Sequence, residues 1–393
     1  MLLRWMPLIV LVYCSLSSVG VHADDKKQLP TAFNNGSRYT INYDDWDYIL
    51  QKSVWVTGPS NRRPSSRAAF KNTATKIKHG NRKATALEGN RVLYHKLDKH
   101  HHTLLLAIRK DLESISHTIS LEQLSKSEQL AYWLNLHNLA VVLEVSSAYP
   151  IKSIKRLTKG KRNVWSKKTM IVAGVPTSIQ DIEKHIIANW KNPLVLYGLY
   201  MGAIGGPNIR NEAYTAESIT DQLNDNAREF VNSLRGIRFW SGDARVSPHY
   251  RLGERFFPDF EKDIKAHMLQ FTSGRLRQRI TETKRFSTQQ FNWGISDLKN
   301  GDSYSGSSYN TNPGALTHFF EGHDEWATSA DTAAPALNIY TTANTPYRGL
   351  PPHVLALVTG IEKRNLNRER KTNVTVEEYV SPMEKRVQTK ENK

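Results

Sequence analysis

The sequence is nearly free of cysteine and of long apolar runs. Its single cysteine is Cys14 among 393 residues, so disulfides, thiolate catalysis and cysteine-ligated metals are excluded for everything after it. Beyond residue 23 no stretch approaches the ~20 apolar residues of a membrane-spanning helix. Stability must therefore come from a hydrophobic core, and the chain is long enough to bury one.

Residues 1–23 have the features of a secretory signal peptide. Arg4 gives a positive start, the apolar stretch 7–14 is too short to span a bilayer, and small residues near position 23 suit a signal peptidase. A lipoprotein signal would use Cys14, but the residue before it is a bulky tyrosine. We therefore expect an exported protein without a transmembrane anchor, periplasmic if the source is a Gram-negative bacterium.

Acidic residues are scarce relative to basic ones, and the formal net charge is +17. Segments 62–91 and 152–168 concentrate Lys and Arg with few or no acids. Such surfaces attract polyanions, and for an exported chain we expect anionic envelope polymers or the membrane surface rather than nucleic acid. Lys159, Lys161 and Arg162 are the candidate binding residues. The alternative is that both segments are solvated loops without a dedicated partner.

The stretch from Ser125 to Val145 is the most apolar part of the chain. Ser125 and Glu128 have capping-box spacing, which predicts a helix start, and the apolar positions that follow predict a helix buried on all sides. Asn135 and Asn138 share one face of this helix. A buried amide without partners costs about 1–3 kcal/mol, so both must either hold neighbouring backbone or line a polar cleft.

Helical and hairpin patterns alternate through the rest of the chain. Helical spacing starts near Tyr43, near Ala86, at Ser178, after Asn211 and after Pro258, and hairpin patterns occupy 169–177 and 236–246. These patterns predict a helix-rich α+β fold. The length alone suggests two or three domains.

Two groups of residues have the ligand types of a metal site. His95, Asp98 and His102 would share a face of the helix expected from Ala86, and segment 318–325 gathers two histidines with three acids. Neither meets a standard zinc spacing, and ordinary polar surface explains both. We predict no metal site and no cofactor.

Glycines 202, 205 and 206 form a glycine-rich turn, which permits close approach of another group. Their spacing is not that of a dinucleotide-binding loop. Gly202, Gly205 and Gly206 are therefore candidate binding residues only.

Five segments in register resemble the bacterial branch of the domain of unknown function 547 family. They are 128–138, 149–154, 178–183, 204–209 and 292–298, and the similarity extends from about Tyr43 to about Leu298. The resemblance implies an exported or envelope protein with no agreed activity. It also implies one main domain in place of several.

The organisation expected from the resemblance has five parts. They are a signal peptide (1–23), a loose, flexible N-terminal segment (24–42), the main domain with short hairpins (43–298), a C-terminal extension (299–360) and a disordered tail (361–393).

Family members typically carry a histidine and two cysteines around the glycine-rich turn. Here those places are Leu196, Met201 and Gly206, and His137 stands where a tyrosine is usual. If relatives use the cysteines for thiol chemistry, this chain has lost it, because leucine and methionine cannot replace a thiolate and its activating imidazole. If the cysteines form a structural disulfide, this chain only lacks a cross-link.

A carboxylate and an imidazole can still perform acid–base chemistry where they meet. Glu183 and His137, supported by Asn135 and Asn138, are the candidates. We expect a non-catalytic binding or scaffolding protein of the cell envelope, and the alternative is a hydrolase or transferase that uses Glu183 and His137 near the glycine-rich turn. The oligomeric state is open.

Overall fold

One buried helix organises the computed structural model, which describes residues 28–64, 83–160, 163–289 and 291–301. This helix, α3 (Lys126–Ala148), is buried at every position from Glu128 to Leu143. The prediction of a helix buried on all sides is confirmed. Such a helix has no solvent face of its own, so other elements must cover it all round.

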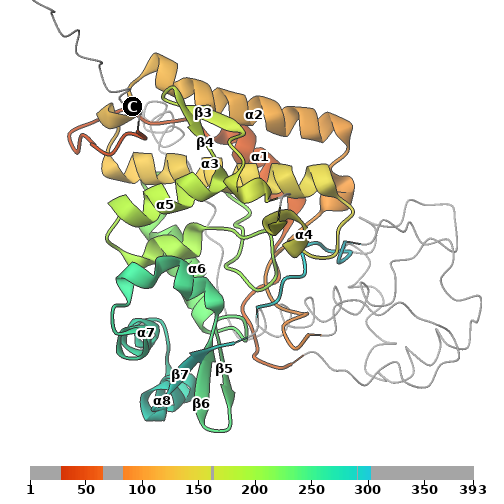
Figure 1. Ribbon diagram of the computed structural model, residues 1–393, viewed down its shortest axis with the longest axis vertical. Helices are drawn as coiled ribbons and strands as arrows, with labels where there is room; N and C mark the ends of the chain where they lie inside the picture. Colours follow the sequence, from red (N-terminus) through yellow and green to blue (C-terminus); the bar gives the residue numbers. More distant parts are fainter. Residues whose placement is uncertain (1–27, 65–82, 161–162, 290, 302–393) are drawn as a thin grey trace, which may run out of the picture.

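Helices cover α3 on several sides. The elements α2 (Lys99–Thr118), α5 (Ile179–Asn189) and α6 (Ile219–Val231) pack against it, and α1 (Asp44–Ser53) packs against α2. In Figure 1, α2, α3, α5 and α6 follow one another from the top of the view downwards. The hydrophobic core is therefore a stack of helices with α3 inside it.

The strands form small sheets at the margins of this stack. β1 (Val54–Trp55) pairs with β2 (Arg91–Val92), and β3 (Met170–Val172) pairs with β4 (Val175–Thr177). A third sheet holds β5 (Ile237–Trp240), β6 (Asp243–Val246) and β7 (Phe286–Thr288), with β6 antiparallel to β5 and parallel to β7. It lies at the end of the molecule opposite α2 (Figure 1). The predicted helix-rich α+β class is confirmed.

Shorter helices complete the described chain. They are α4 (Lys155–Thr158), α7 (Phe260–Leu269), α8 (Gly274–Glu282) and the 3-10 helices η1 (Tyr94–Lys96), η2 (Leu121–Gln123), η4 (Val164–Ser166), η5 (Pro193–Gly198) and η6 (Pro248–Phe256). Both α7 and α8 lie beside the three-stranded sheet (Figure 1).

The helix expected from Ala86 begins only at Lys99, so that boundary was wrong. Before it the chain turns at Gly89, with a φ of 78°, and pairs as β2. Asp98 then caps α2 by accepting a hydrogen bond from the His101 backbone N–H at 3.0 Å. His95 therefore lies outside α2, and the described residues hold no group of three His, Cys, Asp or Glu suited to a metal.

The capping box expected at the start of α3 is only half formed. The Ser125 hydroxyl accepts from the Glu128 N–H, but the Glu128 carboxylate accepts from the Ile41 N–H and the Tyr43 hydroxyl instead of returning to the cap. A complete capping box joins Ser178 and Asp181 at the start of α5. Glu128 is thus used to fasten the N-terminal segment onto α3.

Several sequence predictions fall outside the described residues. They concern the leader with Cys14, the candidates Lys161 and Arg162, the segment 318–325 and the C-terminal parts from residue 302. Within the described ranges, no helix is both long and apolar enough to cross a membrane.

Candidate functional site

Asn135 and Asn138 hold backbone rather than line a cleft. The Asn135 amide donates to the Tyr214 carbonyl at 2.8 Å and accepts from the Tyr214 N–H at 2.9 Å. Asn138 donates to the Gly198 carbonyl and accepts from the Tyr200 N–H, both at 3.1 Å. Both side chains are buried, so of the two roles considered for them the structural one is observed.

His137 and Glu183 meet, as their candidacy required, on the faces of α3 and α5 that pack together. His137 Nε2 lies 3.2 Å from Glu183 Oε1, which also accepts from Trp165 Nε1 at 3.2 Å. His137 Nδ1 lies 2.9 Å from Asn138 Oδ1. Asn138 Oδ1 accepts from the Tyr200 backbone N–H, which identifies it as the amide oxygen, and an amide oxygen can only accept; His137 Nδ1 is therefore the donor in this contact.

This pair is closed to solvent. The side chains of His137 and Glu183 are 0% and 5% exposed. A substrate would have to displace the packed helices to reach them. The geometry orients a histidine well, but it offers no route to a reacting group.

The three glycines of the glycine-rich turn serve different purposes. A Cβ on Gly202 would meet Ile154 and Val145 of the core. A Cβ on Gly205 would lie 2.7 Å from the Asn292 backbone nitrogen, so this glycine permits two chain segments to approach closely. Of the three, Gly205 lines the cavity described below.

Met201 and Gly206 lie against each other. An ideal Cβ on Gly206 would be 3.0 Å from the Met201 Cβ. The two positions at which the resemblance implies cysteines are therefore neighbours, within the reach of a disulfide. In this chain the methionine side chain occupies that space.

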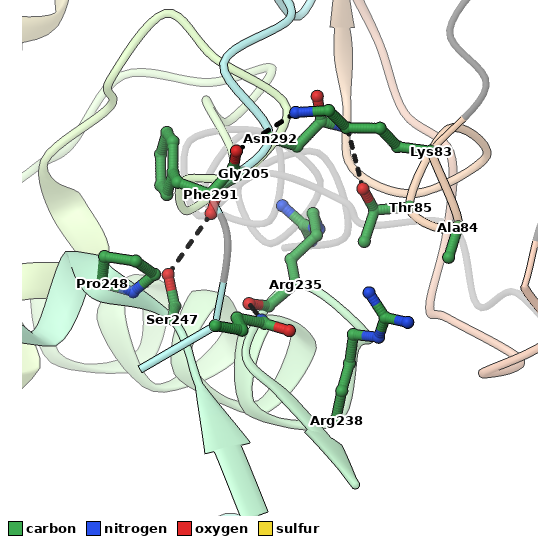
Figure 2. A pocket seen from close by; sticks show the side chains of 11 residues that line it. Lys83, Ala84, Thr85, Gly205, Arg235, Arg238, Ser247, Pro248, Phe291 and Asn292 are labelled. Atoms are coloured by element: carbon green, nitrogen blue, oxygen red, sulfur yellow. Dashed lines mark hydrogen bonds between the residues drawn. The ribbon is translucent and has the colours of Figure 1, made fainter. Parts of the chain in front are cut away.

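A cavity of about 170 Å³ lies where five segments of the chain converge beside β5 (Figure 2). Its lining comprises Lys83, Ala84, Thr85, Gly205, Arg235, Arg238, Ser247, Pro248, Gln289, Phe291 and Asn292. The contacts that join these segments include one from the Asn292 amide to the Thr85 hydroxyl at 2.8 Å and one from the Gly205 N–H to the Asn292 carbonyl at 2.9 Å.

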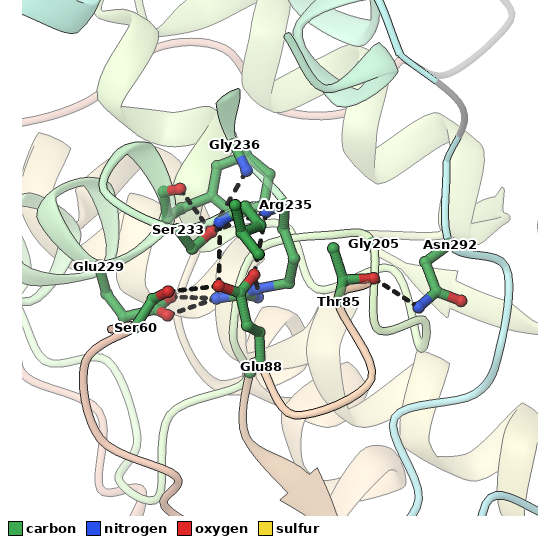
Figure 3. Close-up of polar contacts among 12 residues, drawn as sticks. Ser60, Thr85, Glu88, Gly205, Glu229, Ser233, Arg235, Gly236 and Asn292 are labelled. Atoms are coloured by element: carbon green, nitrogen blue, oxygen red, sulfur yellow. Dashed lines mark hydrogen bonds and ion pairs between the residues drawn. The ribbon is translucent and has the colours of Figure 1, made fainter. Parts of the chain in front are cut away.

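Arg235 lines the cavity and is buried, and polar contacts surround it (Figure 3). Its guanidinium forms a two-oxygen contact with Glu229, and it donates to the Gly206 carbonyl at 2.8 Å and to Asn208 Oδ1 at 3.1 Å. Glu88 lies 4.0 Å from its Nε. The charge of Arg235 is therefore balanced by two carboxylates of the protein.

Glu88 fixes the backbone at the same place. Its carboxylate accepts from the N–H groups of Leu234 at 3.0 Å and Arg235 at 3.1 Å, and from the Ser60 hydroxyl. These hydrogen bonds hold the turn that leads into β5. They therefore help to orient the strand that carries the Arg238 side chain.

The remaining charge in the lining is positive. Arg238 is half-buried and points, with Arg235, into the space below Thr85 and Asn292 (Figure 2). Among the residues that the structure describes, the lining contains no Asp or Glu. The Lys83 ammonium donates to the Phe291 carbonyl at 3.2 Å, and burial, assisted by nearby Lys155, lowers the pKa of Lys83 below its usual range. This is an arrangement that favours an anion.

One acceptor of the lining also lacks a protein donor. The Gln289 amide nitrogen donates to the carbonyls of Leu234 at 3.2 Å and Arg235 at 2.6 Å, while its Oε1 is buried without a hydrogen-bond partner. A ligand hydroxyl could supply that donor.

Of the candidate residues of the basic connection, Lys159 is described, and it is not among the lining residues of the cavity. Lys159 is exposed beyond the end of α4. Lys155 of the same connection lies over the Trp293 ring at 5.3 Å and close enough to Lys83 to act on it. The connection thus reaches the cavity edge at its start, while Lys161 and Arg162 lie outside the described residues.

The region around α3 can be compared with known proteins. Residues 121–231 match the model of a family described as a protein of unknown function, DUF547. No curated protein and no solved structure matches the chain. The DUF547 match contains Asn135, His137, Asn138, Glu183 and the glycine-rich turn.

Most of the cavity lies outside the DUF547 match. Of its lining residues, Gly205 alone falls within 121–231. The charged residues Lys83, Arg235 and Arg238 come from before and after it, and the sequence predictions did not include them. The sequence shows that segment 62–91 is basic, but nothing in it indicates that Lys83 lines the same cavity as Arg238.

Proposed function

We propose that this chain is an exported, non-catalytic binding protein of the cell envelope that captures an anionic group, carboxylate or phosphate, in the cavity beside β5. The observation that carries the proposal is that Lys83 and Arg238 both line the cavity, and that no acid is among its described lining residues. The signal-peptide features, the net charge of +17 and the resemblance to the bacterial branch of the DUF547 family support the location.

The two arginines of the cavity explain why an anion fits there. Arg235 is 2% exposed and balanced by Glu229 and Glu88, so its charge is used inside the protein. The Arg238 side chain lines the cavity, and the described lining residues include no carboxylate. A guanidinium recognises carboxylate and phosphate through paired N–H donors, and a partly buried site strengthens that contact.

The hydrolase or transferase alternative has less support. His137 and Glu183 do touch, but both side chains are buried and neither lines the cavity. Acid–base catalysis needs a substrate within hydrogen-bond reach of the pair. Among the described residues, the charged groups of the cavity can be reached by a ligand and the buried pair cannot, which favours binding over catalysis.

The test is calorimetric titration of the mature protein with galacturonate and with inorganic phosphate. We expect saturable binding by at least one of them, weakened about tenfold in Arg238→Gln and in Lys83→Gln by the loss of one charge-assisted contact. The matched control is Arg251→Gln, which removes an exposed arginine paired with Glu254 at 2.9 Å. No binding of either anion, or equal loss in the control, would overturn the proposal.

A further inference from the structure

The outer face of the three-stranded sheet continues from the cavity. Side chains alternate along a strand, so Arg238 and Trp240 of β5 share a face. The register places Arg245 of β6 opposite Arg238, and Asp243 opposite Trp240. The other face carries Ile237, whose side chain belongs to the core.

This outer face combines positive charge with an exposed ring. Trp240 is 61% exposed, and the Arg245 guanidinium lies 5.6 Å from its ring centre. Asp243 binds Arg285 with an oxygen–nitrogen distance of 2.6 Å, so its charge is already balanced. Two arginines directly opposite each other on a sheet repel, and that repulsion is relieved when an anion lies between them.

Arg238 belongs to both the cavity and this face. A ligand with one anionic group in the cavity would therefore extend along β5 toward Trp240. Gln289 Oε1, the buried acceptor of the cavity, adds a requirement for a hydroxyl or another donor on the same ligand. An anionic group beside a hydroxyl is the chemistry of a sugar acid or a sugar phosphate.

Two other polyanions fit the face less well. Single-stranded nucleic acid is bound by a row of aromatic rings, whereas Trp240 is the one exposed aromatic on this face of the described sheet. A membrane anchor would need an apolar tip, but the hairpin ends in Ser241, Gly242 and Asp243.

We propose that the ligand is an anionic polysaccharide, with one charged unit in the cavity and a neighbouring sugar ring stacked on Trp240 between Arg238 and Arg245. This inference rests on the proposed function and deepens it. The C–H groups on the face of a sugar ring are weakly positive, and they meet the negative face of the indole. Arg245 binds the anionic group of that second unit.

The experiment compares galacturonate with oligogalacturonates of increasing length by calorimetry. For the native protein we expect affinity to rise with length by about tenfold, the contribution of one stacked ring with one charge-assisted contact. Trp240→Ala and Arg245→Gln should each remove this gain and leave the affinity for the monomer unchanged. Neutral cello-oligosaccharides should not compete.

Tyr48→Ala is the matched control. Tyr48 is 60% exposed, and the Lys52 ammonium lies 5.6 Å from its ring centre, but it belongs to α1 in another part of the fold. The control should keep the full gain with length. Equal loss in Tyr48→Ala would overturn the assignment to the sheet face.

The outcomes separate this inference from the proposed function. Monomer binding that depends on Arg238 but does not improve with length would overturn the polysaccharide and leave the anion-binding cavity. The absence of galacturonate binding, with phosphate still bound, would likewise overturn the polysaccharide alone, whereas the absence of binding by both galacturonate and inorganic phosphate would overturn the cavity itself. Tighter, Trp240-dependent binding of oligothymidylate or of phosphatidylglycerol vesicles would replace the polysaccharide with nucleic acid or membrane.

Discussion

The polar cluster around His137 and the cavity around Arg238 differ in whether the protein itself satisfies the polar side chains. His137, Glu183 and Asn138 form their hydrogen bonds with other groups of the protein, and the side chains are buried where the helices pack together. Beside β5, the protein balances Arg235 but leaves Arg238 facing a cavity without a carboxylate. The comparison teaches that the protein itself satisfies the polar groups of the buried cluster, whereas the surplus of positive charge at the cavity is what the proposed binding requires.

The largest expected effect comes from removing the balanced arginine. In Arg235→Met two carboxylates, Glu88 and Glu229, would lose their cation, and breaking a buried ion pair costs about 3–5 kcal/mol. Urea unfolding measures this loss. Arg238→Gln, three residues away, should change the free energy of unfolding by no more than about 0.5 kcal/mol. An equal loss of unfolding free energy in the two variants would contradict the assignment of Arg235 to stability and of Arg238 to ligand binding.

The next effect is a pH dependence of the closed cluster. His249 donates from Nε2 to the Leu196 carbonyl at 2.7 Å, and burial lowers its pKa from 6.5 to about 4, although Glu183 nearby acts in the opposite direction. A lowered histidine pKa gives stability that is complete above pH 6.5 and is lost as the pH falls toward 4. For His249 the loss is about 3 kcal/mol.

The variant His249→Gln isolates this contribution. A glutamine amide can still donate to Leu196 but cannot titrate, so unfolding free energies between pH 7 and 4 should fall less steeply than in the native protein. Burial lowers the pKa of His185 and His267 to about 4 as well, so part of the slope should remain. Identical slopes in the two proteins would contradict the assignment.

The cavity should respond to pH in the opposite direction. Because the pKa of Lys83 is lowered by burial, its ammonium loses its proton at a lower pH than an exposed lysine does. Anion affinity should then weaken as the pH rises through that lowered pKa. The slope of affinity against pH, measured for the native protein and for Lys83→Gln, checks this, since the variant should show no such decline.

The smallest stability effects concern the two asparagines of α3. Replacing Asn135 with Leu would leave the N–H and carbonyl of Tyr214 without partners, and Asn138→Leu would do the same to Tyr200 and Gly198. Each should cost about 1–3 kcal/mol in urea unfolding. Full stability in both variants would show that these amides are not needed to hold the backbone.

Local patterns predicted much of the fold. The apolar run after Ser125 predicted a buried helix, and the hairpins at 169–177 and 236–246 were correctly placed, because each depends on side chains close together in the sequence. The start of α2 was missed because β2 forms by pairing with β1, more than thirty residues earlier. The strand β7 was missed for the same reason, since it pairs with β6 across α7 and α8.

The candidate site shows the same limit. The sequence suggested Glu183 and His137 as a pair, and the two side chains are in contact. A buried carboxylate and a buried imidazole each need a hydrogen-bond partner, which makes such a contact expected. Lys83, Arg238 and Asn292 come from distant segments of the chain and line one cavity. A pattern within one segment cannot predict such long-range convergence. Within each segment, a basic residue is indistinguishable from ordinary solvated surface.

The central claim is that an anion occupies the cavity between Lys83 and Arg238. The most direct measurement is anomalous diffraction from crystals of the native protein soaked in selenate, an anion with a strong anomalous signal. The account predicts a selenium peak within hydrogen-bond distance of the Arg238 guanidinium and the Lys83 ammonium, and its absence from crystals of Arg238→Gln. Ordered selenate elsewhere on the basic surface, with the native cavity empty, would contradict it.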